Sequence, residues 1–140
     1  MPSDRGFKEL PHTADRAIRV WAPDPAGLFA EAARGMYALM GARTGAKTAS
    51  IRTFESAGPD LESLLVAFLS ELIYLAEGER LAFTRIRGRA GETAEGWDLK
   101  VDMEGESLLS MSKSVKAATY HHLRVNRFAG RCEAEIVFDV

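Results

Sequence analysis

Two amphipathic segments with well-marked ends constrain the fold of this chain more than any other feature of its sequence. The first begins at Asp24, a good helix cap, and continues with Pro25, whose missing N–H suits the first helical position. It ends at Gly41, a residue type that favours the left-handed turn after a helix. Its apolar residues recur at steps of three and four: Leu28, Phe29, Ala32, Ala33, Met36, Tyr37 and Met40. This period predicts a helix that packs one face on a core.

The second segment has the same organisation. It begins with Pro59 and the cap Asp60, and it closes at Gly78. Its apolar stripe has an almost ideal helical period: Leu61, Leu64, Leu65, Phe68, Leu69, Leu72 and Ile73. We expect both stripes to pack on one sheet, with Phe68 and Leu72 fully buried.

The rest of the chain predicts strands and short connections. Residues 97–104 alternate Trp, Leu, Val and Met with charged side chains, which is typical of a half-buried strand with one wet face. Further strands are expected at residues 7–10, 17–21, 48–55, 80–89, 115–125 and 131–138. This order predicts a single α+β domain over residues 1–140, in which two amphipathic helices pack on a mostly antiparallel β-sheet.

Composition limits the classes of function. The chain has 140 residues, with 18 Lys and Arg against 20 Asp and Glu, so its net charge is −2. This balance argues against a protein held to nucleic acid by bulk charge, although it permits a protein that acts on a nucleic-acid enzyme. One cysteine, Cys132, excludes an internal disulfide and fits a reducing compartment. Since no apolar leader or long apolar run is visible, we expect a soluble cytoplasmic protein with no membrane contact.

The polar loop His12-Thr13-Ala14-Asp15 and the chain end Asp139-Val140 are candidates for a metal site. Asp and Thr in a loop also commonly bond the backbone of a turn, so the loop alone indicates little. Asp139 beside the terminal carboxylate, together with Asp15, would offer the hard oxygen ligands that Ca²⁺ and Mg²⁺ prefer. Spacing alone supports this site weakly, because the two carboxylates lie far apart in the sequence.

The segment from Lys116 to His122 is another polar cluster. On a strand, Lys116, Tyr120 and His122 would share one face, and Thr119 and His121 would share the other. A solvated strand face with a buried hydroxyl gives the same pattern. No phosphate-binding loop or hydrolase motif is present in the sequence, so no standard enzyme class is indicated.

Cys132 has two interpretations. It could act as a nucleophile with His121 or His122. Alternation instead places it on the apolar face of the last expected strand, so we expect a buried, unreactive thiol.

Four stretches give the chain a resemblance to the archease family, nearly from end to end. They are His12-Thr13-Ala14-Asp15, Leu28-Phe29-Ala30-Glu31-Ala32-Ala33-Arg34-Gly35-Met36, Lys116-Ala117-Ala118-Thr119-Tyr120-His121 and Val137-Phe138-Asp139-Val140. Their order, in a chain of this length, makes the match specific. Arg16 and His122 depart from the commoner family pattern, at positions to which no role is assigned.

The resemblance implies a protein cofactor and not an independent enzyme. Archease assists the GTP-dependent RNA ligase that joins 2′,3′-cyclic-phosphate or 3′-phosphate ends to 5′-hydroxyl ends in tRNA splicing and RNA repair. It promotes guanylylation of the ligase, which is the formation of its histidine–GMP intermediate, and so allows multiple turnover. It can also broaden the nucleotides that the ligase accepts. On this resemblance, the chain would meet RNA only through the ligase.

The resemblance also implies site residues. A divalent metal ion, with Ca²⁺ the expected species, would be held by Asp15, Asp139 and Val140. Lys116 matches a lysine regarded as functionally important, and His12 and His121 are further candidates for ligase activation. Two other functions stay open: a chaperone-like modulator of a tRNA-modifying enzyme such as a tRNA methyltransferase, and a small metal-dependent hydrolase.

Overall fold

The computed structural model describes residues 4–11 and 15–140, and these residues form two helices and eight strands. The helices are α1 (Pro25–Met40) and α2 (Leu61–Gly78). The strands are β1 (Gly6–Leu10), β2 (Arg16–Ala22), β3 (Arg43–Gly58), β4 (Leu81–Thr93), β5 (Gly96–Ser110), β6 (Ala117–Ala118), β7 (Asn126–Phe128) and β8 (Arg131–Asp139). The expected α+β class is confirmed. In the described part of the chain, no helix is both long enough and apolar enough to cross a membrane.

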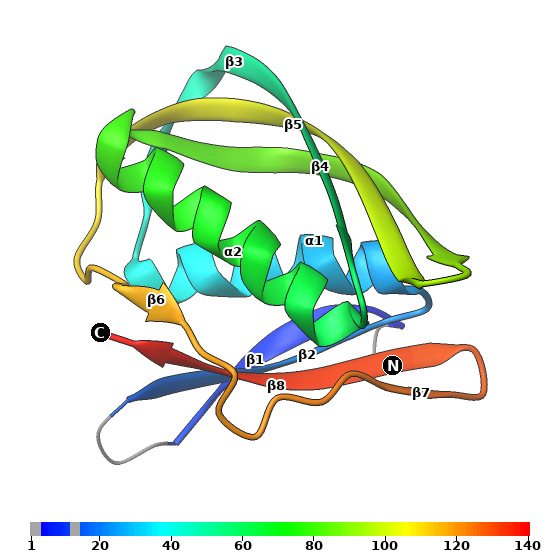
Figure 1. Ribbon diagram of the computed structural model, residues 1–140. Helices are drawn as coiled ribbons and strands as arrows, with labels where there is room; N and C mark the ends of the chain where they lie inside the picture. Colours follow the sequence, from blue (N-terminus) through cyan, green and yellow to red (C-terminus); the bar gives the residue numbers. More distant parts are fainter. Residues whose placement is uncertain (1–3, 12–14) are drawn as a thin grey trace.

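The strands form two antiparallel sheets, with both helices between them (Figure 1). The five-stranded sheet has the order β1-β2-β8-β6, with β7 also paired to β8, and the three-stranded sheet has the order β3-β5-β4. The expectation of one sheet is therefore wrong. The physical reason is that α1 is buried around most of its circumference, and both helices contact strands of both sheets.

Both helices begin as their sequences predict. The Asp24 carboxylate accepts a hydrogen bond from the N–H of Gly27 over 2.7 Å, and Asp60 accepts one from Ser63 over 2.7 Å. These bonds satisfy N–H groups that have no partner within the helix. Gly41 ends α1 with φ of 63°, the left-handed conformation that glycine adopts most easily.

The core joins the two helices to the sheets. Phe68 and Leu72 of α2 are fully buried, as expected. The Phe68 ring lies 5.9 Å from the ring of Phe29 in α1 and 5.7 Å from that of Phe54 in β3. One aromatic cluster therefore holds α2 to both α1 and the three-stranded sheet.

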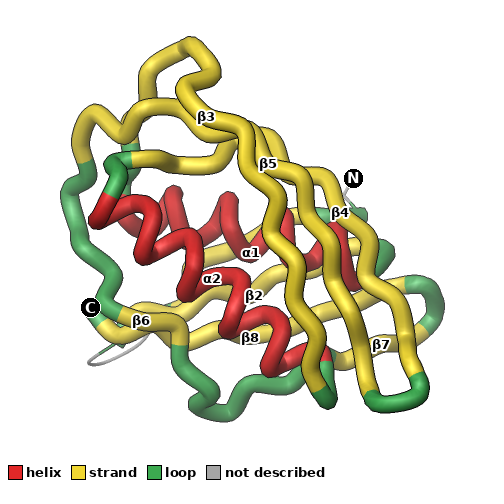
Figure 2. The backbone as a smooth tube through the Cα atoms, turned by 45° about the horizontal axis from the view of Figure 1, so that its top comes forward, coloured by secondary structure: helices red, strands yellow, loops and turns green. Residues whose placement is uncertain are grey.

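The long β4–β5 hairpin and the even longer β3 form one wall of the molecule (Figure 2). The alternation of Leu99, Val101 and Met103 with exposed charged residues is confirmed, since all three are buried. The hairpin reaches further than expected, because β4 continues to Thr93 and β5 starts at Gly96.

The predicted strand over residues 115–125 is wrong. Only Ala117 and Ala118 pair with β8, and the chain then turns. The Thr119 hydroxyl donates to the carbonyl oxygen of Val137 over 2.9 Å, and His122 has φ of 52°. The Thr119 N–H donates to the same carbonyl oxygen over 3.0 Å, so this carbonyl accepts two bonds from Thr119. The left-handed residue His122 then reverses the chain.

Candidate functional site

The two carboxylates and the lysine expected at the site come from three neighbouring strands. Asp139 is the last residue of β8, which lies between β2 and β6. The register pairs Arg16, the first residue of β2, with the residue before Asp139, and it pairs the first residue of β6 with Asp139 itself. Asp15 and Lys116 each precede their strand by one residue. The backbone therefore brings all three to one end of the five-stranded sheet, and Figure 1 shows the C-terminus beside β6 there.

A backbone hydrogen bond ties Lys116 to Asp139. The Lys116 N–H donates to the Asp139 carbonyl oxygen over 2.8 Å. Phe138 is fully buried while Asp139 is exposed, because successive side chains of a strand point to opposite faces. Lys116 is also exposed, and Asp15 is half-buried. This end of the sheet is thus open to a partner or an ion from solvent.

Arg16 takes no part in this group, although it follows Asp15 directly. Its register partner Phe138 shares its face of the sheet, which is the face opposite to Asp139. The Arg16 Nη1 lies 2.6 Å from a carboxylate oxygen of Glu9 in β1. This residue, which departs from the family pattern, therefore serves an ion pair with the edge strand.

The histidines near Lys116 lie in the turn after β6. The His121 N–H donates to the Thr119 hydroxyl oxygen over 3.3 Å, and the His121 and His122 ring centroids are 4.2 Å apart. Tyr120 is exposed. Because the turn replaces the expected strand, the predicted common face of Lys116, Tyr120 and His122 is wrong. His12, the other candidate histidine, lies outside the described residues.

The donors at this end suit a hard cation. Asp15 and Asp139 supply carboxylate oxygens, and Val140, which is exposed, supplies main-chain oxygen. Within residues 4–11 and 15–140, no three His, Cys, Asp or Glu side chains lie close enough together to hold a metal ion. The expected ligand set contains only two such side chains, so the remaining ligands would be main-chain oxygen and water.

Cys132 lies near the start of β8, at the opposite end of this strand from Asp139. It is buried in β8, as expected, and burial raises the pKa of its thiol. A thiol held in the protonated form is a poor nucleophile. The nucleophile interpretation therefore gains no support.

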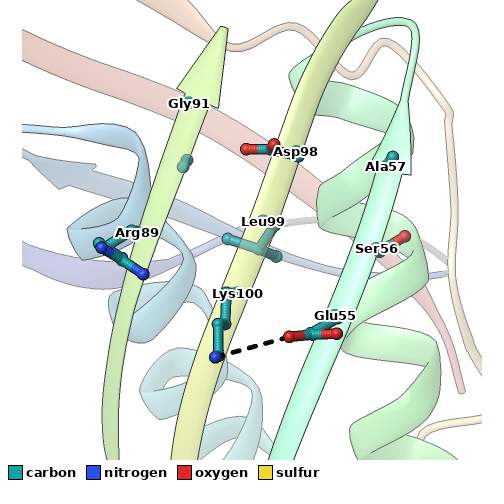
Figure 3. Close-up of a pocket in the computed structure, with 9 residues that line it drawn as sticks. Glu55, Ser56, Ala57, Arg89, Gly91, Asp98, Leu99 and Lys100 are labelled. Atoms are coloured by element: carbon teal, nitrogen blue, oxygen red, sulfur yellow. Dashed lines mark ion pairs between the residues drawn. The ribbon is translucent and has the colours of Figure 1, made fainter. Parts of the chain in front are cut away.

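A large hollow lies elsewhere, on the outer face of the three-stranded sheet. It has a volume of about 740 Å³, and Figure 3 shows the residues that line it, among them Glu55, Arg89, Asp98 and Lys100. The sequence interpretation gave no role to these residues. The alternation Arg85-Ile86-Arg87-Gly88-Arg89, readable in the sequence, is the signal that would have drawn attention to this face.

Comparison with known proteins gives a consistent result. Residues 7–140 match the Archease protein family. The Protein archease of Methanopyrus kandleri is 33% identical over 138 residues, covering 96% of this chain and 99% of that protein. The Protein archease of Methanosarcina mazei is 31% identical over 146 residues, covering 100% of both chains.

Solved structures agree with the sequence matches. The solution structure of Protein 1598 of Methanobacterium thermoautotrophicum superposes with a TM-score of 0.82 at 27% identity, covering 96% of this chain and 99% of that one. The crystal structure of an archease from Thermotoga maritima, described as a possible chaperone, has a TM-score of 0.70 at 22% identity and covers 95% and 96% of the two chains. Because the family match spans nearly the whole chain and full-length relatives share about a third of its residues, this chain belongs to the archease family.

Proposed function

We propose that this protein activates a GTP-dependent RNA ligase by promoting guanylylation of the ligase. The observation that supports the proposal is the convergence of β2, β8 and β6, which brings the backbones of Asp15, Asp139 and Lys116 to one solvent-exposed sheet end. These residues stand in the stretches that resemble the archease family. Archease membership makes a cofactor role the leading interpretation.

The chemistry of guanylylation explains why carboxylates and a lysine would be useful. Attack of a ligase histidine on GTP requires the phosphate charge to be neutralised and the reacting groups to be held in line. Asp15, Asp139 and main-chain oxygen of Val140 would hold a divalent cation, expected to be Ca²⁺, which supplies positive charge. Lys116 would direct its ammonium group towards the same phosphates, with its backbone fixed to Asp139.

The rest of the chain has the properties of an accessory protein. Its net charge of −2 would favour encounter with a basic partner surface. His12 and His121 are further candidates for contact with the ligase. If binding of this protein changes the nucleotide pocket of the ligase, it would also broaden the range of nucleotides that the ligase accepts. We expect the protein alone neither to hydrolyse GTP nor to join RNA, because its sequence has no phosphate-cradling loop.

Multiple-turnover ligation by the cognate ligase tests this proposal. Added in substoichiometric amounts, the protein should raise the rate of ligase–GMP formation and convert single turnover to multiple turnover. Asp15→Ala, Asp139→Ala and Lys116→Ala should each remove most of the stimulation, while circular dichroism shows them folded. Lys47→Ala is the matched control, since Lys47 is an exposed lysine on β3, far along the chain from this sheet end.

Two outcomes would contradict the proposal. If the three variants stimulate the ligase as well as wild type does, the site assignment is wrong although ligase activation stands. If wild type stimulates no cognate ligase, a chaperone-like role towards a tRNA-modifying enzyme such as a tRNA methyltransferase becomes the leading function. The Thermotoga maritima structure carries the description of a possible chaperone. That role predicts protection of the enzyme from aggregation without Asp15 or Asp139.

A further inference from the structure

Three arginines form a row on the edge strand β4. Arg85, Arg87 and Arg89 occupy alternate positions, so their side chains leave the same face of the sheet, and all three are exposed. The register pairs them with Glu104, Asp102 and Lys100 of β5. These partners alternate with buried residues of β5, so the row lies on the outer, solvent face of the three-stranded sheet. We call Arg85, Arg87 and Arg89 the β4 arginine row.

The β4 arginine row lacks the partners that most other arginines have. Arg52, for example, lies 2.6 Å from a carboxylate oxygen of Glu79, and Arg131 lies 2.7 Å from one of Glu133. Within the described part of the chain, no ion pair or side-chain hydrogen bond is made by the three arginines of the row. Their five-donor guanidinium groups are therefore available to a ligand.

In the described structure, the Asp102 and Glu104 carboxylates of β5 make no ion pair with the row, and their hydrogen bonds run to β3 on the opposite side. The Asp102 Oδ1 accepts from the hydroxyl of Thr53 over 2.9 Å, and the Glu104 Oε1 accepts from that of Thr48 over 3.4 Å. Lys100 likewise reaches across to Glu55 of β3, with 3.6 Å between Nζ and Oε1, and Figure 3 shows Arg89 standing apart from this pair on β4. The three guanidinium groups thus stand along one edge of the sheet face, beside these carboxylates of β5 but not bonded to them.

One cross-strand pair is unfavourable without a ligand. Arg89 and Lys100 are direct register partners, and like charges in this position repel. A hollow of about 290 Å³ adjoins them, lined by Arg87, Gly88, Arg89, Lys100 and Asp102. An anion bound there would contact several cations at once and would offset their repulsion.

The ligand that fits is a chain with regularly spaced negative charges and little apolar surface. Alternate residues of a strand are about 6.6–6.8 Å apart, so the row offers a linear series of guanidinium groups suited to successive phosphates. A protein partner would need an apolar core at its interface. In the described chain, the strongly exposed large apolar residues of this sheet are Ile51, on the far strand β3, and Leu109, in the part of β5 beyond its pairing with β4, so neither is a register neighbour of the row. The face also offers no exposed aromatic ring for stacking a base.

We propose that the β4 arginine row binds the phosphate backbone of single-stranded RNA directly and without sequence preference. This binding is local, so it is compatible with a net charge of −2 for the whole chain. It stands apart from the carboxylates and Lys116, which belong to the other sheet. The protein would therefore contact the RNA itself and not only a ligase that carries it.

Fluorescence anisotropy of a labelled single-stranded 20-nucleotide RNA, titrated with the protein alone at low salt, tests the proposal. The triple variant Arg85→Gln, Arg87→Gln, Arg89→Gln should bind at least tenfold more weakly than wild type. A matched triple variant, Arg43→Gln, Lys47→Gln, Arg124→Gln, removes the same charge from exposed positions elsewhere and should bind within about twofold of wild type. The wild-type affinity should fall with salt at a log–log slope of about −2, as three phosphate contacts to a single strand require.

Several outcomes would overturn the proposal. Equal weakening by the two triple variants would mean that bulk charge, not the row, attracts the RNA. Absence of binding by wild type at low salt would mean that the row has no RNA ligand, and circular dichroism of each variant excludes misfolding as the cause of a loss. If poly-glutamate displaces the RNA as well as unlabelled RNA of equal charge does, the row takes an acidic protein segment. No ligase is present, so these results leave the guanylylation proposal unaffected.

Discussion

Tyr37 is a polar residue whose hydroxyl lies inside the core. Its hydroxyl oxygen accepts a hydrogen bond from the backbone N–H of Phe83 over 3.1 Å. Burial raises the pKa of Tyr37 to about 12, outweighing the opposite effect of this hydrogen bond. Tyr37→Phe would leave the Phe83 N–H without a partner, so we expect the free energy of unfolding at pH 7 to fall by about 1–3 kcal/mol, measured by urea denaturation.

The same shift predicts how Tyr37 responds to alkali. Its pKa is about 10 in the unfolded chain and about 12 in the fold, so the unfolded chain releases the proton first as pH rises. The stabilisation is complete below pH 10 and is lost between pH 10 and 12, with a loss of order 2 kcal/mol. Tyr37→Phe should remove this part of the slope, whereas Tyr74→Phe, at an exposed position, should keep it. Equal slopes in wild type and Tyr37→Phe would contradict the assignment.

Among the elements, α2 depends most clearly on a single side chain. Phe68 contacts a ring of α1 and a ring of β3, and it has no exposed surface. Phe68→Ala should lower the free energy of unfolding by about 3–5 kcal/mol, through lost burial and a residual cavity. Ile51→Ala, at a position 74% exposed, is the control and should change it by less than about 0.5 kcal/mol. An unchanged denaturation midpoint for Phe68→Ala would contradict the packing of α2.

Elements with local signals were the ones that the sequence could predict. Asp24, Asp60 and the apolar period define both helices within a few residues, because capping and periodicity act over one or two turns. The apolar pattern of residues 115–125 gave a wrong prediction, since Val115 and Leu123 are buried from irregular segments and not from a strand. Alternation shows which face of a strand is buried, but not which sheet the strand joins. The division into two sheets therefore could not be predicted.

The candidate site could be predicted even less from local sequence patterns, because it depends on long-range strand pairing. Asp15, Asp139 and Lys116 were named from resemblance to a family, because no local spacing links residues so far apart in the sequence. Their approach depends on the β2–β8 and β8–β6 registers, which are long-range. The β4 arginine row was readable as an alternation, but its lack of partners depends on the hydrogen bonds of Asp102 and Glu104 across to β3.

At the scale of the whole molecule, the two proposed surfaces lie on different sheets. The carboxylates and Lys116 are at one end of the five-stranded sheet, and the β4 arginine row is on the outer face of the three-stranded sheet. Both helices separate the sheets (Figure 1). A ligase bound at the sheet end would therefore leave the arginine row free for RNA. Variants of the two surfaces should accordingly separate ligase activation from RNA binding.

The proposed carboxylate site would couple metal binding to global stability. The backbones of Asp15 and Asp139 come together only when β2 pairs with β8, so the unfolded chain would lack the proposed site. A ligand bound only by the folded state stabilises it by about 2.7 kcal/mol at one hundred times its dissociation constant. Thermal unfolding of wild type should therefore shift upward in CaCl₂ relative to EDTA.

Replacing both carboxylates should abolish the stabilisation by calcium without lowering the stability of the fold in EDTA. In EDTA, Asp15→Asn/Asp139→Asn should be at least as stable as wild type, because two neighbouring negative charges that repel each other have been removed. In CaCl₂ the double variant should gain nothing, while wild type and the control Asp98→Asn, an exposed carboxylate on β5, should gain equally. An equal calcium shift in wild type and the double variant would place the ion elsewhere, and the metal assignment would then be wrong.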